Sequence, residues 1–131
     1  MLSIRSTADM DRALASPIDA DLKRLLELRR GQLLEHDGYD LGELAHFIVA
    51  GPFDTIATIE GVVGVPLSTN LVDGSRLGEP GFTANFEHVA RHGLWFEAVL
   101  VLSDDGFGIA LFVPDRPDID AGLLDLLRSH A

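Results

Sequence analysis

The segment Trp95–Pro114 has the sequence WFEAVLVLSDDGFGIALFVP and carries the strongest structural signal in the chain. Two runs rich in β-branched and aromatic residues flank Ser103–Gly106, which consists of turn-forming residues. The pattern predicts a β-hairpin with strands over 95–102 and 107–113. Both strands are apolar on both faces except at Glu97, so both faces of the sheet need a cover. Helices of the same chain or a second copy of the protein would supply this cover. Of the two, we expect a homodimer.

Outward from the hairpin, the sequence predicts helices and one more strand. Ser16 before Pro17 is typical of a helix start. The serine side chain accepts hydrogen bonds from the free backbone N–H groups of the first turn, and proline suits the first helical position. Thr83 has the same capping chemistry, and Gly93 suits a helix end. The expected elements are helices over 7–15, 17–35, 55–63 and 83–91, a strand over 44–49, and a last helix capped by Asp118 or Asp120.

The length of 131 residues indicates one domain, since a chain of this size buries a sufficient core. We expect a single α+β domain over residues 1–131. Its predicted architecture is a three-stranded, mainly antiparallel sheet flanked by four to five helices, in the order α-α-β-α-loop-α-β-β-α. Residues 1–16 are expected to form a loosely attached N-terminal helix. The loop from Val65 to Gly81 is long for a compact domain, which favours it as a binding surface.

The chain is strongly acidic, with 10 Lys and Arg against 21 Asp and Glu and a formal charge of −11. The surplus lies after residue 35, because residues 1–35 carry six basic and six acidic side chains. Such a surface repels phosphate backbones and anionic lipids, so neither direct nucleic-acid binding nor membrane binding is expected. A basic protein partner would suit it.

Composition excludes further classes of function. The chain has no cysteine, which rules out thiol catalysis, thiolate metal sites and disulfides. The sequence has no signal-peptide pattern, and its charge-free stretches are shorter than a membrane span. We therefore expect a cytoplasmic protein of bacterial type.

His88 and His92 are the first candidates for chemistry, because two histidines four residues apart on a helix can share one metal ion. Glutamate does not directly follow His88, so the zinc-protease pattern is absent. A third ligand would come from His46, Asp104 or His36. The alternative is that these are surface histidines, and we assign no metal ligand, catalytic residue or cofactor.

His46 and Glu97 are polar residues within apolar strands. A buried imidazole needs a hydrogen-bond partner, and Glu97 on a neighbouring strand is one possibility. We interpret His46 as a structural histidine, with a catalytic base as the alternative. Glu97 lies among Phe96, Ala98 and Val99, so it is also either buried with a partner or facing a pocket. The alternative for Glu97 is a carboxylate at a sheet edge or facing solvent. The adjacent acids Asp104 and Asp105 are better explained by turn chemistry than by a cation site.

Three stretches carry a resemblance to known sequences. They are Leu102–Gly108 with Phe112–Pro114, the strand Leu44–Val49, and Asn70–Gly74. These stretches resemble small bacterial proteins without assigned activity, often carried as plasmid or integrative-element cargo. The resemblance covers most of the chain from about Leu22. It implies a bacterial accessory protein and carries over no functional residue.

The first functional hypothesis is a non-enzymatic, acidic protein-interaction module of a bacterial accessory system, since the sequence contains no catalytic set. One alternative is a small metal-assisted hydrolase or ligand-binding protein that uses the histidines. Another is an acidic inhibitor, immunity or DNA-mimic protein that occupies a basic site on its partner.

Overall fold

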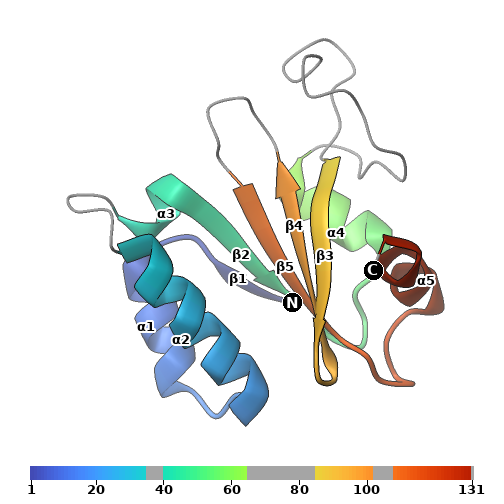
Figure 1. Ribbon diagram of the computed structural model, residues 1–131, viewed down its shortest axis with the longest axis horizontal. Coiled ribbons are helices and arrows are strands. Elements are labelled where there is room, and N and C mark those ends of the chain that lie inside the picture. The colour runs from blue at the N-terminus through green and yellow to red at the C-terminus, as the bar shows by residue number, and fades with distance from the viewer. Residues whose placement is uncertain (35–39, 65–84, 102–107, 131) are drawn as a thin grey trace, which may run out of the picture.

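The computed structural model describes residues 1–34, 40–64, 85–101 and 108–130. These residues form helices and a mixed sheet, which confirms the α+β class (Figure 1). The helices are α1 (Thr7–Ala15), α2 (Ala20–Leu34), α3 (Leu41–Leu44), α4 (Ile56–Val63) and α5 (Ala121–His130). The strands are β1 (Leu2–Ile4), β2 (Ala45–Val49), β3 (Asn85–His92), β4 (Trp95–Val101) and β5 (Gly108–Pro114).

Within the described residues the strands form one five-stranded sheet in the order β1-β2-β5-β4-β3. β2 and β5 are parallel, and all other neighbours are antiparallel. The prediction of three strands is therefore wrong, because β1 and β3 extend the sheet at its two edges. The predicted strands form its centre. The hairpin turn predicted at Ser103–Gly106 and the loop predicted over Val65–Gly81 lie outside the described residues.

β3 occupies the segment for which a helix over 83–91 is predicted, and that prediction is wrong. Its register with β4 pairs Val89 with Ala98 and Arg91 with Phe96. Gly93, with a φ of 63°, lies in the two-residue turn between the strands. A glycine with positive φ suits a helix end and a tight hairpin turn equally. Only the long-range pairing with β4 distinguishes the two structures.

Asp19, rather than Ser16, sets the start of α2. Its carboxylate accepts hydrogen bonds from the backbone N–H groups of Asp21 and Leu22, each at 3.1 Å, as an N-cap does. The same carboxylate accepts from Nε1 of Trp95 at 3.0 Å. Ser16 instead ends α1. The contact with Trp95 fixes the beginning of α2 against β4.

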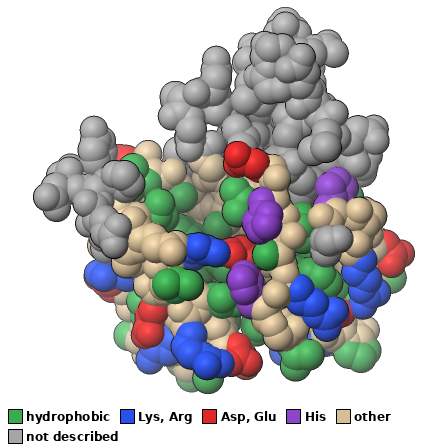
Figure 2. All heavy atoms as spheres, viewed as in Figure 1, with side chains coloured by type: hydrophobic (Ala, Val, Ile, Leu, Met, Phe, Trp, Pro, Cys, Tyr) green, Lys and Arg blue, Asp and Glu red, His purple; other side chains and the backbone are tan. Residues whose placement is uncertain are grey.

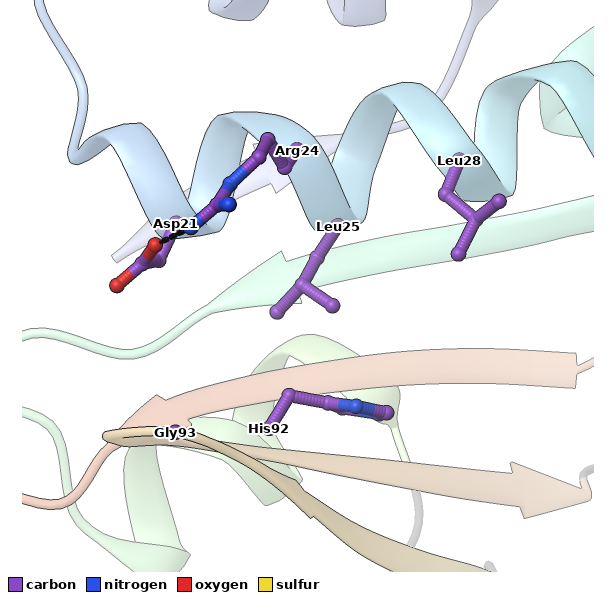
Figure 3. Close-up of a pocket in the computed structure, with 6 residues that line it drawn as sticks. All are labelled: Asp21, Arg24, Leu25, Leu28, His92 and Gly93. Atoms are coloured by element: carbon purple, nitrogen blue, oxygen red, sulfur yellow. Dashed lines mark hydrogen bonds and ion pairs between the residues drawn. The ribbon is translucent and has the colours of Figure 1, made fainter.

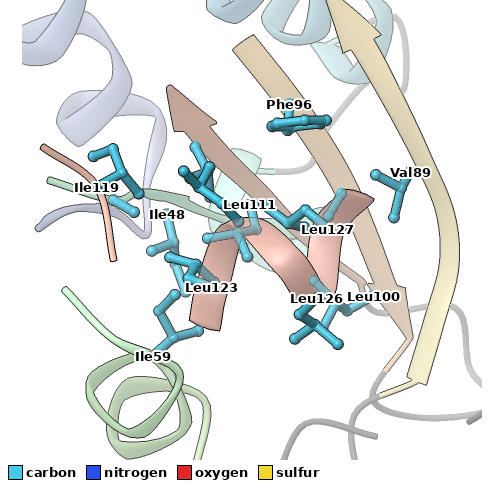
Figure 4. Packing of buried hydrophobic residues seen from close by; sticks show 14 of the residues in the cluster. Ile48, Ile59, Val89, Phe96, Leu100, Leu111, Ile119, Leu123, Leu126 and Leu127 are labelled. Carbon is cyan, nitrogen blue, oxygen red and sulfur yellow. The ribbon is translucent and has the colours of Figure 1, made fainter. Parts of the chain in front are cut away.

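Helices of the same chain cover both faces of the sheet. On one face α1 and α2 pack in a cluster that includes Ile4, Met10, Ala13, Leu22, Leu26, Phe47, Trp95 and Phe112. On the other face α4 and α5 contribute Ile59, Leu123, Leu126 and Leu127 against Ile48, Phe96, Leu100 and Leu111 (Figure 4). The apolar faces that favour a homodimer are thus covered within one chain, and the homodimer stays a prediction. None of the described helices is both long enough and apolar enough to span a membrane.

Candidate binding cleft

Two hollows open between α2 and the sheet. The first, which we call the hairpin hollow, has a volume of about 480 Å³ and lies beside the β3–β4 turn. Leu25 and Leu28 approach it from α2 and His92 from β3 (Figure 3). Asp21 and Arg24 form an ion pair at its rim. The hairpin hollow therefore combines apolar side chains with a balanced pair of charges.

The second hollow, which we call the mid-sheet hollow, has a volume of about 410 Å³ and lies farther along α2. Arg29, Gln32 and Leu33 line it from α2. The sheet and the end of α3 contribute Leu44, Ala45, Phe47, His88, Glu97, Val99, Gly108, Ile109 and Ala110. Most of these side chains are apolar, so the mid-sheet hollow is an apolar concavity with a few polar groups. We call the two hollows together the α2 cleft.

A buried carboxylate lines the mid-sheet hollow and contacts His92, which lines the hairpin hollow. Glu97 is 1% exposed and faces α2 from β4, which is an inner strand of the sheet. The interpretation of Glu97 as a carboxylate at an edge or facing solvent is therefore wrong. Arg29 donates to both of its oxygens, from Nε at 2.7 Å and from Nη2 at 2.6 Å, and His92 Nε2 lies 3.1 Å from Oε1. Figure 2 shows histidine, basic and acidic side chains gathered near the middle of this face. We call Arg29, Glu97 and His92 the charge bridge, because they link α2 to β3 and β4 across the cleft.

The charge bridge keeps the carboxyl group of Glu97 ionised despite its burial. Burial raises the pKa of Glu97, but the hydrogen bonds and charge of Arg29, assisted by His92, outweigh burial and bring the pKa below its ordinary value. The hydrogen bonds to Glu97 in turn raise the pKa of Arg29. A carboxylate whose oxygens are occupied and whose pKa is low is a poor general base. The arrangement therefore suits binding and positioning better than proton transfer.

The structure does not bring the candidate metal ligands together. His88 and His92 lie on β3 rather than on a helix, so four residues separate them by roughly 13 Å along the strand. His46 belongs to the opposite face of the sheet. Asp104 and His36 lie outside the described residues. Within the described part of the chain, no group of three metal-ligating side chains is close enough to hold an ion.

His46 has different partners from the one predicted. It is 9% exposed, and its Nε2 lies 2.7 Å from Ser3 Oγ and 3.3 Å from Arg5 Nε, which donates to it. Glu97 is the wrong partner, because it lies on β4 and faces the other side of the sheet. Burial, and then the charge of Arg5, lower the pKa of His46. The neutral ring thus accepts at Nε2 and carries its proton on Nδ1.

Arg29 and Gln32 are the cleft residues that the sequence does not single out. Arg29 is 68 residues from Glu97 along the chain, and its Nη1 donates to Gln32 Oε1 at 2.7 Å. The available signal is Glu97 itself, since a glutamate in an apolar strand indicates an opposite charge nearby. The sequence does not say which of several arginines supplies that charge.

Neither a protein family, nor a curated protein, nor a solved structure matches this chain.

Proposed function

We propose that this protein is a non-enzymatic binding module that receives an apolar segment of a partner protein in the α2 cleft. The observation that carries the proposal is the mid-sheet hollow of about 410 Å³, whose lining is mostly apolar. A concavity with apolar walls and a few fixed polar groups is the usual form of a recognition site. Leu28, at 53% exposure, extends the apolar surface along α2.

The charges inside the cleft favour an apolar segment over a basic one. Asp21 pairs with Arg24, and Glu97 pairs with Arg29. Because each acid has its own arginine, the cleft offers little net attraction to a basic segment. The formal charge of −11 would act over the remaining surface, where it speeds the approach of a basic partner without forming the bound contact.

Selection of random dodecapeptides displayed on phage against the immobilised protein tests the proposal. We expect enrichment of peptides with two or three spaced apolar residues, as groove-bound helices and strands present. Binding of the enriched peptides should fall at least tenfold in Val99→Arg and in Leu28→Arg, which place a charge in the two hollows.

Phe53→Arg is the matched control, because Phe53 is 94% exposed and lines neither hollow. Peptides that bind Val99→Arg and Leu28→Arg as well as they bind the original protein would overturn the proposal. Failure to enrich any peptide would also overturn it. Circular dichroism of each variant separates a lost site from a lost fold.

Binding of a small molecule in the mid-sheet hollow is a second candidate function, because its volume falls within the usual range for ligand sites, roughly 300–1,000 Å³. Native mass spectrometry of protein purified without chelator tests this candidate. A retained mass that disappears in Val99→Arg supports it, and a bare polypeptide mass contradicts it. The acidic inhibitor hypothesis rests on charge alone and stays a prediction.

A further inference from the structure

The face of the sheet beneath α2 is covered over part of its width. α1 and α2 lie toward β1 and β2 (Figure 1). To the apolar cluster under these helices, β4 contributes Trp95 and β3 contributes none of its described residues. Ala90 and Val99 are half-buried on this face, whereas Val89 and Ala98 on the other face are buried. The α2 cleft is therefore floored by a part of the sheet that no described helix covers.

α2 presents one continuous side to the cleft. Asp21, Leu25 and Leu28 line the hairpin hollow, and Gln32 lines the mid-sheet hollow. The steps of four, three and four residues between them keep all four side chains on one side of the helix. At about 1.5 Å per residue, this side extends over roughly 16 Å. Side chains at such spacings form the ridges against which a second helix packs.

The walls of the cleft favour a helix over an extended segment. The floor is a face of the sheet and the side is a helix, so the backbone groups of both are paired within their own elements. An extended segment on this floor would bury N–H and C=O groups without partners, whereas a helix pairs its own. Ala45, Gly108 and Ala110 of the floor are small, which lets a helix approach closely.

The charges that line the cleft differ from those of the whole chain. The chain has 21 Asp and Glu against 10 Lys and Arg. The cleft is lined by two arginines and two histidines against two acids. Of these acids, Glu97 is buried and Asp21 pairs with Arg24. The cleft therefore repels a carboxylate of a partner less than the chain as a whole does.

Hydrogen-bond donors remain available beside Arg29. This arginine donates to both oxygens of Glu97 and to Oε1 of Gln32. Because a guanidinium only donates, Gln32 turns its oxygen toward Arg29 and keeps its Nε2 amide for another partner. Gln32 is exposed, and its Nε2 has no partner among the described residues. A carboxylate, which only accepts, matches the donors of Gln32 and Arg29.

We propose, on the basis of the binding function proposed above, that the occupant of the α2 cleft is an amphipathic helix of a partner protein. This helix lies beside α2 over the open part of the sheet. Its apolar residues, at spacings of three and four, face Leu25, Leu28 and Val99. A glutamate or aspartate on its flank places a carboxylate at Gln32 and Arg29.

Two phage libraries distinguish a helix from an extended segment. One library has an alanine-rich helical framework randomised at positions i, i+3, i+4 and i+7, and the other has a threonine-rich framework randomised at i, i+2, i+4 and i+6. We expect helical peptides to be enriched, and to lose binding in Leu28→Arg but not in Phe53→Arg. Extended peptides that bind as tightly would contradict the helical occupant and leave the binding function intact. Enrichment from neither library would contradict both.

The carboxylate is tested with an enriched helical peptide that carries an acidic residue; a set of enriched peptides without any acidic residue would contradict this part. Replacing that residue by lysine should weaken binding roughly tenfold, as measured by fluorescence anisotropy. Gln32→Glu should weaken the acidic peptide to a similar extent, because it replaces the amide donors by an acceptor of nearly the same shape.

Lys23→Gln is the matched control for Gln32→Glu. It makes the same change in net charge at an exposed position of α2 that lines neither hollow, and it should leave the affinity for the acidic peptide unchanged. Circular dichroism checks that each variant is folded. Equal affinities for the acidic and the lysine peptide, or an acidic peptide that binds Gln32→Glu as well as the original protein, would show that no carboxylate meets Gln32.

Discussion

The buried carboxylate of Glu97 is the residue whose environment is most costly to change. At 1% exposure it has lost its hydration, so its charge depends on Arg29 and His92 for compensation. The side chain of Arg29 is 32% exposed, so solvent screens part of the attraction. The net contribution of the pair is therefore modest, while the loss of one partner is expensive.

Arg29→Leu should lower the free energy of unfolding by about 2–4 kcal/mol near neutral pH, because it leaves a buried charge with incomplete compensation. Burial then dominates, and the pKa of Glu97 rises above its ordinary value of 4.5. When the folded-state pKa of Glu97 is raised, its contribution to stability is present below pH 4.5 and is lost as the pH rises through the folded-state pKa. The difference in free energy of unfolding between Arg29→Leu and the original protein should therefore become smaller as the pH is lowered toward 4.5. Urea unfolding of both proteins near neutral pH and near the ordinary pKa measures this difference.

Arg30→Leu is the control for that experiment. Arg30 is the next residue of α2 and pairs with Asp11, which is 56% exposed, at 2.9 Å. A solvent-exposed ion pair contributes at most about 1 kcal/mol, and we expect a loss in that range at every pH. Equal losses in the two variants would contradict the special role of the charge bridge.

At the scale of elements, two helical glycines differ in whether close packing requires a glycine at that position. Gly31 lies within α2, and a Cβ added there would meet nothing within 4 Å. A Cβ at Gly42 in α3 would overlap the backbone carbonyl of Arg5. Gly31 therefore has no steric reason to be glycine, whereas Gly42 lets α3 approach the segment after β1.

Gly31→Ala should raise the free energy of unfolding by roughly 0.5–1 kcal/mol, because alanine restricts the unfolded chain and favours the helix. Gly42→Ala should lower it by more than about 1 kcal/mol, since backbone must move to relieve the overlap. Thermal melting of the two variants beside the original protein measures both changes. A stabilised Gly42→Ala would show that α3 does not pack against Arg5 as described.

Local signals predict an element well when capping, turn chemistry and period agree. The helix over 7–15 and the helix ending at Gly64 are confirmed, and Gly64 has the positive φ of a C-cap. The strand predicted over 44–49 is β2, which begins one residue later at Ala45. The signals fail where one residue is compatible with two structures. Gly93, just before β4, suits both a helix end and a hairpin turn. They also fail for β1, which is three residues long and forms only because β2 accepts it.

At the scale of the whole molecule, the α+β class is predictable and the cleft is not. The class follows from periodicities along the chain. The cleft depends on Arg29 meeting Glu97 across 68 residues and on where α2 lies over the sheet. Several arginines of the N-terminal segment have similar sequence surroundings. Only the packed structure, with the beginning of α2 held by Trp95 and Asp19, distinguishes Arg29 from the others.

The free energy of unfolding of the whole molecule should fall as the pH drops below 6.5, the ordinary pKa of histidine. Burial and the charge of Arg5 lower the pKa of His46 from 6.5 in the folded state, so the unfolded chain binds the proton more tightly. The contribution of neutral His46 to the free energy of unfolding is complete above pH 6.5. It declines as the pH falls from 6.5 toward the lower pKa of His46 in the folded state. Glu97 does not act in this window, because its folded pKa lies below 4.5.

His46→Gln should flatten this decline, since a glutamine oxygen can accept from Ser3 and Arg5 but does not titrate. Urea unfolding in steps between about pH 7.5 and pH 5.5 should show a smaller loss of free energy for His46→Gln than for the original protein. His88→Gln is the control, because His88 is exposed and its removal should leave the decline unchanged. An identical pH dependence in all three proteins would mean that protonation of His46 costs the folded state nothing. The contact between β1 and β2 through Ser3 and His46 would then contribute to stability independently of pH.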